Sequence, residues 1–182
     1  MKRKIVVFMA SVWLCLAMLC CSACGWIKLP YVRICVDGLS MYPTYEDGDE
    51  FLARLTKNGV KAGRGDVIIL SVAEYEEYES KPQVEYLVKR LIAIEGDKVR
   101  CTDGQIEICY AGTEQWVDLV ERYQVHYTNK TAYDFAEYVV GEGEIFFLGD
   151  NRNNSLDSRY KEGFSTLEDR LYKVEDIFAV AI

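Results

Sequence analysis

Ser40 is the first side chain of the sequence whose setting suits a nucleophile. It lies in the segment Asp37–Thr44, between Gly38 and Pro43 and directly after a run of residues that predicts a strand. A serine between a flexible glycine and a turn-forming proline can be presented at the end of a strand, with nearby backbone N–H groups free to stabilise an oxyanion. Taken alone, the segment is also compatible with an ordinary turn.

A lysine occurs in an apolar strand pattern, where a charged side chain is unusual. In the segment Tyr86–Ile94, alternation places Lys89 on one face with leucine and alanine, and Arg90 on the other face with valine and isoleucine. An apolar setting disfavours the charged amine, lowers its pKa and makes a neutral base available near neutral pH. The alternative is a lysine at a sheet edge whose amine extends into water. Lys89 is therefore a candidate general base.

The third segment of chemical interest, Phe146–Arg159, runs from an apolar strand pattern into a turn rich in hydrogen-bond donors and acceptors. Ser155 could orient a base through a hydrogen bond, and Asp157 could form an ion pair with Arg159 that holds the turn. A purely structural loop fits the same residues. An oxygen-rich cation site fits less well, because the Asp and Asn spacing lacks the glycine and terminal glutamate of an EF-hand. No metal ligand is assigned.

The elements that must position these segments are predicted to be mostly β-strands. β-branched and aromatic residues dominate eight segments, several of them bounded by Gly-Asp or Asp-Gly turns. The predicted strands are Val32–Val36, Glu50–Leu55, Asp66–Ser71, Val84–Ile94, Lys98–Cys101, Ile106–Cys109, Glu144–Leu148 and Asp176–Ile182. A short helix is predicted at Thr166–Leu171, with Ser165 or Thr166 as its cap. The tyrosine-rich stretch between Cys109 and Gly141 has no readable periodicity, so the predicted fold class is mainly β.

An uncharged apolar run from Ile5 to Trp26 precedes the predicted strands. At ~1.5 Å rise per residue, a helix of this length can cross a hydrocarbon core of ~30 Å. Basic residues before the run predict a cytoplasmic N-terminus. A cleaved secretory signal is the alternative suggested by Ser22-Ala23-Cys24, but the apolar core of such a signal is usually shorter. We expect residues 1–27 to form a basic tip and a transmembrane anchor, and residues 28–182 to form an extracytoplasmic β-rich catalytic domain.

The chain is acidic, with a net charge of −8 from 21 Lys and Arg and 29 Asp and Glu residues. No acidic residue precedes Asp37, so the region after the apolar run carries all of the negative charge. Acidic domains repel phosphate backbones, whereas nucleic-acid binding depends on basic patches. Nucleic acid is therefore not expected as a partner.

The seven cysteines of the chain form no recognisable disulfide or metal framework. Four lie in the apolar run, where cysteine behaves as a small hydrophobic residue, so the Cys21–Cys24 spacing is weak evidence for redox or metal chemistry. Counting outward from the Asp103-Gly104 turn does not place Cys101 opposite Cys109, so a direct cross-strand disulfide does not follow. Cys35 has no evident partner.

Behind the apolar N-terminal run, the chemistry-bearing segments resemble, in this order, the conserved boxes of bacterial type I signal peptidases. The resemblance covers nearly the whole chain, and chance agreement on all four boxes is remote. The matching residues are Ser40-Met41 with Pro43-Thr44, Gly65-Asp66-Val67, Lys89-Arg90 with Gly96-Asp97, and Gly149-Asp150-Asn151 through Ser155, Asp157, Ser158 and Arg159. The resemblance implies a membrane-bound serine endopeptidase that removes N-terminal signal peptides from exported preproteins and needs no cofactor.

The resemblance also implies a role for each of these site residues. Ser40 corresponds to the nucleophile, Lys89 to the general base and Ser155 to the hydroxyl that positions the lysine. Asp157 and Arg159 correspond to structural supports. The implied partners are the lipid bilayer and preproteins with small residues, chiefly alanine, at the first and third positions before the cut. The implied location is the cell membrane, crossed once.

Three further places in the sequence bear on how closely the chain follows the family. Met41 would line the site near the substrate. Gly38 stands where Gram-negative members have a serine that helps to bind the oxyanion, so only backbone donors remain there, as in the shorter Gram-positive members. The segment after Gly163 has Phe164 and then Ser165, and so lacks the hydrophobic residue that usually follows directly behind the glycine.

Other classes of protein fit the residues less well. A self-cleaving SOS-repressor protease also pairs serine with lysine on a β scaffold, but it is soluble and carries a DNA-binding module. A Ser-His-Asp enzyme would need His126, which has no recognisable motif around it. Archaeal and eukaryotic signal peptidases have histidine where Lys89 stands, which favours a bacterial enzyme. An inactive anchored binding protein is disfavoured because all candidate catalytic residues are present.

Overall fold

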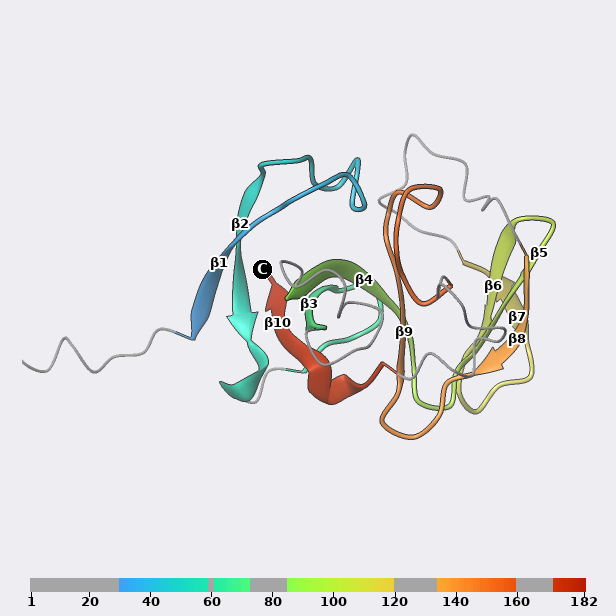
Figure 1. The fold of residues 1–182 in the computed structure, drawn as a ribbon. Helices are drawn as coiled ribbons and strands as arrows, with labels where there is room; N and C mark the ends of the chain where they lie inside the picture. Colours follow the sequence, from blue (N-terminus) through green and yellow to red (C-terminus); the bar gives the residue numbers. More distant parts are fainter. Residues whose placement is uncertain (1–29, 59–60, 73–84, 120–133, 160–171) are drawn as a thin grey trace, which may run out of the picture. The chain divides into compact units, whose positions relative to one another are not determined.

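The computed structural model describes residues 30–58, 61–72, 85–119, 134–159 and 172–182. Residues Tyr31–Ile182 form one compact unit, and the regular structure in its described part is mostly β-strand (Figure 1). The predicted mainly β fold is therefore confirmed. In this part of the chain no helix is long and apolar enough to cross a membrane. The predicted anchor, the predicted helix at 166–171 and the only histidine, residue 126, lie outside the described residues.

Six strands form the larger sheet, in the order β1-β2-β10-β3-β4-β9, and each neighbouring pair is antiparallel. They are β1 (Tyr31–Cys35), β2 (Glu50–Leu55), β3 (Val67–Ser71), β4 (Tyr86–Ile94), β9 (Ile145–Leu148) and β10 (Ile177–Ala181). Each overlaps a predicted strand. One turn of 3-10 helix, η2 (Thr56–Asn58), follows β2, and another, η4 (Val174–Asp176), precedes β10.

Four strands form the second sheet, in the order β7-β6-β5-β8. The strands β5 (Lys98–Thr102) and β6 (Gln105–Cys109) flank the predicted Asp103-Gly104 turn, where both residues have positive φ, of 51° and 75°. The predicted register is confirmed, because Cys101 lies opposite Ile106 rather than opposite another cysteine. Among the described residues, the three cysteines, including Cys35, form no disulfide.

Two strands of the second sheet fall where no strand was predicted. They are β7 (Trp116–Asp118) and β8 (Phe135–Val139), in the tyrosine-rich stretch. Only one of their eight residues is buried, so neither strand carries a clear alternating pattern. Pairing with β6 and β5 holds them in place, and such long-range pairing overrides local sequence preference.

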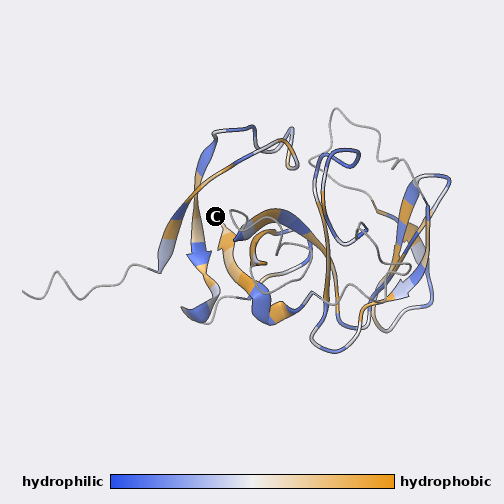
Figure 2. Ribbon diagram, viewed as in Figure 1, coloured by the Kyte–Doolittle hydropathy of each residue, from blue (hydrophilic) through white to orange (hydrophobic). Residues whose placement is uncertain are grey.

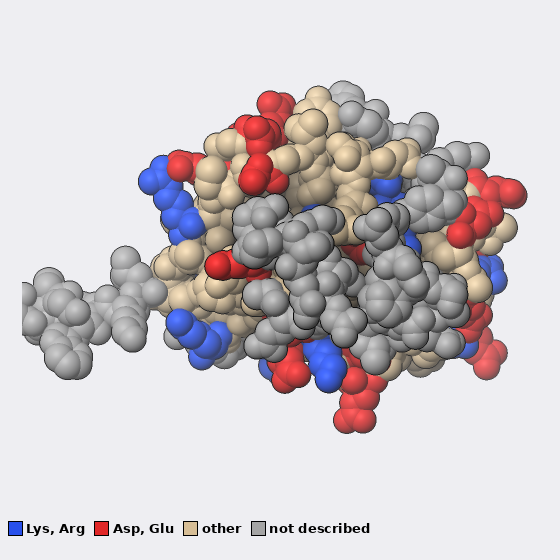
Figure 3. All heavy atoms as spheres, viewed as in Figure 1, with Lys and Arg blue, Asp and Glu red and all other residues tan. Residues whose placement is uncertain are grey.

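Strand β9 connects the cores of the two sheets. Its side chains alternate, so Ile145 and Phe147 pack into the core of the larger sheet, whereas Phe146 and Leu148 pack into the core of the second sheet. A strand buried on both faces is a continuous apolar run, as Figure 2 shows for several central strands. Acidic side chains occur at several separate places on the face shown in Figure 3, so the negative charge is not gathered in one tail.

A third apolar cluster bears directly on the site, and we call it the cleft floor. It lies on one face of the larger sheet, where four residues are buried and five others are partly exposed. The buried members are Ala53, Leu55, Ile69 and Ala179, and the partly exposed members are Val32, Ile34, Phe51, Val88 and Phe178. Apolar side chains that remain partly exposed in a concave region are typical of a binding cleft.

Candidate active site

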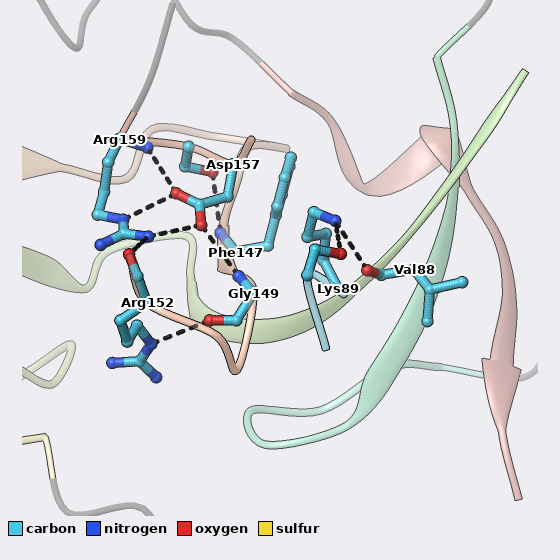
Figure 4. A network of polar contacts seen from close by, with 9 residues as sticks. Val88, Lys89, Phe147, Gly149, Arg152, Asp157 and Arg159 are labelled. Atoms are coloured by element: carbon cyan, nitrogen blue, oxygen red, sulfur yellow. Dashed lines mark hydrogen bonds and ion pairs between the residues drawn. The ribbon is translucent and has the colours of Figure 1, made fainter. Parts of the chain in front are cut away.

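Ser40 and Lys89 lie in direct contact, although 49 residues separate them in the sequence. Ser40 follows β1 in a turn, and Lys89 lies in β4. The Lys89 Nζ is 2.7 Å from the Ser40 Oγ and donates a hydrogen bond of 3.0 Å to the Val88 carbonyl oxygen (Figure 4). The lysine is 3% exposed, so its amine is almost completely removed from water.

Burial lowers the pKa of Lys89 from 10.5 to about 8, because water no longer stabilises the charged amine. The carboxylates of Asp157 and Asp150 act in the opposite direction, since negative charge favours the ammonium form. With a pKa near 8, roughly one lysine in ten is neutral at pH 7, whereas almost none would be at the ordinary pKa. The site therefore supplies a base next to a hydroxyl at neutral pH.

The backbone around Ser40 is held by hydrogen bonds on both sides. Gly38 has a φ of +91°, a conformation that favours glycine, and its N–H donates to Asp47 Oδ1 at 2.8 Å. The predicted backbone donor at Gly38 is therefore already engaged. The Ser40 N–H has no hydrogen bond within the described part of the chain, so it is available to a bound group.

Asn151 holds the other side of the Ser40 turn. Its N–H donates to the Ser40 carbonyl oxygen at 3.0 Å, and its Nδ2 donates to the Leu39 carbonyl oxygen at 3.1 Å. These two bonds fix the carbonyl groups that precede and follow the Ser40 amide. Asn151 lies in one of the segments that match the family boxes, but the sequence pattern predicts no role for it.

Ser155 lies near the Ser40–Lys89 pair without bonding to it. Its Oγ is buried and makes no hydrogen bond of ordinary geometry with Lys89 or any other described residue, although it lies close enough to Asp157 to help lower the pKa of that carboxyl. All three residues nevertheless line one cavity. Gly149 makes this proximity possible, because a Cβ there would overlap Ser155 Oγ and come within 2.5 Å of the Ser40 carbonyl oxygen.

The predicted ion pair between Asp157 and Arg159 is present and fully buried. Arg159 donates from Nε to Asp157 Oδ1 and from Nη2 to Oδ2, both at 2.8 Å (Figure 4). The Gly149 N–H donates to the same carboxylate at 3.0 Å. Burial alone would raise the pKa of Asp157, but these hydrogen bonds and the Arg159 charge outweigh it and lower the pKa. The carboxylate therefore remains ionised beside the site.

A second buried charge network joins the three segments of the site, and we call it the brace: Thr44, Gly65, Arg90 and Asp150. Arg90 donates from Nε to Asp150 Oδ1 at 2.8 Å and from Nη2 to Oδ2 at 2.6 Å. Its Nη1 donates to the Gly65 carbonyl oxygen at 2.7 Å, and Thr44 Oγ1 donates to Asp150 Oδ2. Sequence reasoning assigned no site role to these residues. The brace could have been found from Arg90, because a guanidinium on an apolar strand face requires an anionic partner.

Two cavities meet at Ser40 and Lys89. The larger is a cleft of about 630 Å³ between β1 and the first half of β4, and Ile69 and Phe178 of the cleft floor line it. Met41, fully buried, is among the residues that line this cleft next to Ser40. The smaller cavity, of about 470 Å³, is polar and is lined by the 37–40 turn and by the 153–156 turn.

The arrangement is that of a nucleophile with its base. Among the side chains that the structure describes, no group of three or more His, Cys, Asp or Glu residues could hold a metal ion. A buried neutral amine in contact with a hydroxyl can accept the hydroxyl proton as the oxygen attacks a carbonyl carbon. The site can therefore support acyl transfer.

The chain is similar in sequence to several known proteins. Residues 7–176 match the family described as signal peptidase, peptidase S26. Signal peptidase I T of Bacillus subtilis (strain 168) is 32% identical over 144 residues, which cover 78% of this chain and 68% of that protein. Signal peptidase I S of the same organism is 28% identical over 172 residues, 91% of this chain and 84% of that protein. A signal peptidase I from Enterococcus faecalis V583 aligns with a TM-score of 0.46 and 26% identity, covering 66% of this chain and 97% of that structure.

Proposed function

Since this chain belongs to the peptidase S26 family of signal peptidases, we propose that it cleaves signal peptides from preproteins with Ser40 as nucleophile and Lys89 as general base. The observation that carries the assignment of the two residues is the 2.7 Å contact between the buried Lys89 Nζ and the Ser40 Oγ. A lysine whose pKa is lowered to about 8 is suited to take a proton near neutral pH.

The reaction follows from the positions of these groups. Neutral Lys89 takes the proton of Ser40 while Ser40 Oγ attacks the scissile carbonyl carbon, and the Ser40 N–H stabilises the oxyanion. The Lys89 ammonium then gives its proton to the leaving amine, and the signal peptide remains as an ester on Ser40. Water, deprotonated by Lys89, hydrolyses the ester and restores the enzyme. Activity should rise about tenfold per pH unit below pH 8 and level off above it.

The first half of β4 provides an edge to which a substrate strand can add. β3 pairs with β4 from Tyr86 to Arg90, whereas β9 pairs with it only from Arg90 onward. Within the described structure, Tyr86–Lys89 therefore has no partner strand on the side of β9. An extended peptide can bind such an edge through main-chain hydrogen bonds, and side-chain pockets then supply specificity.

The two cavities differ in polarity, and this difference orients the peptide. The cleft between β1 and β4 has an apolar floor, whereas the smaller cavity is lined by Asp37, Asn153, Asn154 and Ser155. The signal peptide side of the substrate should therefore lie in the cleft, and the first residues of the mature protein should lie in the smaller cavity. Small residues at the first and third positions before the cut are part of the proposal because the family resemblance implies them. Next to Ser40, the cleft is lined by the apolar Met41 and Val88.

Membrane attachment completes the proposal. Residues 1–27 form a single anchor with the N-terminus in the cytoplasm, and residues 28–182 lie on the other side of the membrane, where exported preproteins emerge. The uncharged run from Ile5 to Trp26 and the preceding basic residues support this topology. N-terminal sequencing of the mature protein tests it: retention of the first residues is expected, whereas a start near Cys24 or Gly25 would contradict the anchor.

The decisive experiment is cleavage of a preprotein by the purified, detergent-solubilised full-length protein. We expect a cut at one site, behind small residues, and no cleavage by Ser40→Ala. Ser71→Ala, at the end of β3, is the matched control and should retain activity. His126→Ala should also cleave normally. Cleavage by Ser40→Ala at the wild-type rate would end the assignment of the nucleophile.

A further inference from the structure

We infer that the Asn151 side chain aims the Ser40 N–H at the oxyanion of the reaction, which makes Asn151 a positioning residue for the catalytic step. This inference rests on the proposed function, because it assumes that the scissile carbonyl oxygen becomes an oxyanion beside Ser40. Asn151 does not occur among the described residues that line the two cavities. Its effect on the reaction therefore has to pass through the Ser40 turn, to which it is bonded.

The oxyanion donor and the Leu39 carbonyl belong to one peptide group. The bond between Leu39 and Ser40 is trans, and a trans peptide is planar, so its N–H and its C=O point in opposite directions. Asn151 Nδ2 donates to the Leu39 carbonyl oxygen at 3.1 Å, and the Tyr42 N–H donates to the same oxygen at 3.2 Å. These two bonds hold the carbonyl, and the Ser40 N–H is thereby directed away from the Asn151 amide.

Asn151 also holds the peptide group on the other side of Ser40. Its own N–H donates to the Ser40 carbonyl oxygen at 3.0 Å. This second bond is made by the backbone, so it can persist when the side chain at 151 is replaced. The side-chain bond to Leu39 can therefore be tested by itself. A donor at the Leu39 oxygen also polarises the peptide group, which strengthens the Ser40 N–H as a donor.

The turn that carries Asn151 is itself firmly held. The preceding residue, Asp150, is fully buried and accepts two hydrogen bonds from Arg90 of β4. The Asn154 N–H donates to the Asn151 carbonyl oxygen at 2.9 Å and closes the turn. A group that orients a catalytic donor has to be fixed by its own neighbours. The brace supplies this support, so it is connected through Asn151 to the oxyanion donor.

The direction of the Ser40 N–H matters because the other predicted backbone donor is already engaged. The Gly38 N–H donates to Asp47 at 2.8 Å, so it does not share the oxyanion in this arrangement. Loss of one oxyanion donor lowers kcat by about 10²–10³-fold in other enzymes. A donor that remains but is aimed less well should cost a part of that factor.

The test is steady-state cleavage of a preprotein by the full-length protein in detergent, with kcat and KM measured separately across the pH range. Asn151→Ala should lower kcat by roughly 10- to 100-fold, because the Ser40 N–H is no longer held in its direction. KM should stay close to the wild-type value, since the oxyanion forms only in the reaction. The pH midpoint of kcat should also stay the same, because the contacts of Lys89 are unchanged.

Two further variants complete the design. Asn151→Asp keeps the shape of the side chain, but a carboxylate cannot donate a hydrogen bond. It should lower kcat at least as much as Asn151→Ala on the high-pH plateau, where the added charge no longer alters the amount of neutral Lys89, and it replaces Asn151→Ala if that variant does not fold. Gln105→Ala is the matched control, because it removes an amide that donates to a backbone carbonyl at 3.4 Å in β6, and it should keep the wild-type kcat.

The outcomes separate this inference from the proposed function. If a folded Asn151 variant cleaves with the wild-type kcat, the inference is wrong and the proposed function stands. The inference is also wrong if KM rises while kcat is unchanged, or if the pH midpoint shifts while the plateau is unchanged, since these results would place Asn151 on the peptide or on Lys89. If the wild-type protein makes no cut that depends on Ser40, the proposed function fails, and the inference fails with it.

Discussion

Lys89 and Arg90 are consecutive residues of β4, both are buried, and their electrostatic surroundings are opposite. In the described structure, the Lys89 amine contacts a hydroxyl and a carbonyl oxygen and has no carboxylate within ion-pair distance. The Arg90 guanidinium, by contrast, binds both oxygens of Asp150. On the same strand, Lys89 therefore has no ion pair within the described structure, whereas its neighbour Arg90 is paired with Asp150.

The difference follows from what each group can do when it is buried. A guanidinium does not lose its proton in proteins, so a buried arginine needs an anionic partner. A lysine can respond to burial by losing its proton, and its pKa falls to about 8 here. The Ser40–Lys89 pair uses this response to provide a base, whereas the brace uses a permanent charge to hold the Ser40 turn, β4 and the turn after β9 together.

The largest expected effect comes from replacing Lys89 by arginine, which cannot lose its proton when it is buried. Lys89→Arg keeps a positive charge but supplies no neutral base. The cleavage rate should therefore fall by roughly 10²–10⁴-fold. Single-turnover cleavage of a preprotein measures the loss. Lys98→Arg, at the start of β5 where the side chain is 44% exposed, is the matched control and should cleave at the wild-type rate. Substantial activity in Lys89→Arg would assign the base to another group.

Breaking the brace should have the next largest effect, and it should act on stability. Asp150→Asn keeps the shape of the side chain but leaves Arg90 buried without its anion, which should lower the free energy of unfolding by about 3–5 kcal/mol. Urea denaturation followed by tryptophan fluorescence measures the change. If the variant unfolded at the wild-type urea concentration, the buried pair would not be holding the three segments together.

Removing the lysine should instead stabilise the fold at neutral pH. The folded pKa of Lys89, about 8, lies below the unfolded value of 10.5, so the unfolded chain binds more protons between these two values. Burial of the ammonium therefore lowers the free energy of unfolding by its full amount below pH 8. This loss of stability shrinks as the pH rises and is absent above about 10.5. Lys89→Met should raise the free energy of unfolding by up to about 3 kcal/mol at pH 7.

Urea denaturation of the wild type and of Lys89→Met at pH 7 and at pH 10 tests this effect. The urea unfolding curves of the two proteins should lie apart at pH 7 and approach each other at pH 10. An equal difference at both pH values would show that methionine changes packing and not the cost of a buried charge.

Most of the strands and the apolar setting of Lys89 could be predicted from sequence because their signals are local, whereas the pairing of Lys89 with Ser40, 49 positions away, was implied only by the family resemblance. Strand alternation in β4 is enough to place Lys89 among apolar residues, and the Asp103-Gly104 turn is enough to fix the register of β5 and β6. The ion pair between Asp157 and Arg159 spans only two residues, so its geometry is also local.

The remaining features depend on contacts between distant segments. Asn151 donates to the carbonyl oxygen of Leu39 across 112 positions, and no property of either residue alone predicts that contact. Strand β7 was missed for the same reason, because its three residues are held by pairing with β6. For Ser155 the family pattern predicted a bond to Lys89, but a hydroxyl position depends on rotamers that sequence does not determine.

The smallest expected effect comes from an ion pair of the same chemistry in the opposite environment. Arg33 of β1 and Glu50 of β2 form a diagonal ion pair between the two strands, and their side chains are 70% and 46% exposed. Water and salt screen such a pair, so Glu50→Gln should change the free energy of unfolding by less than about 1 kcal/mol, and the change should vanish in high salt. Urea denaturation at low and high salt, beside Asp150→Asn, makes the comparison. Equal losses in the two variants would mean that burial is not what makes the brace important, and the contrast between Lys89 and Arg90 would then need another cause.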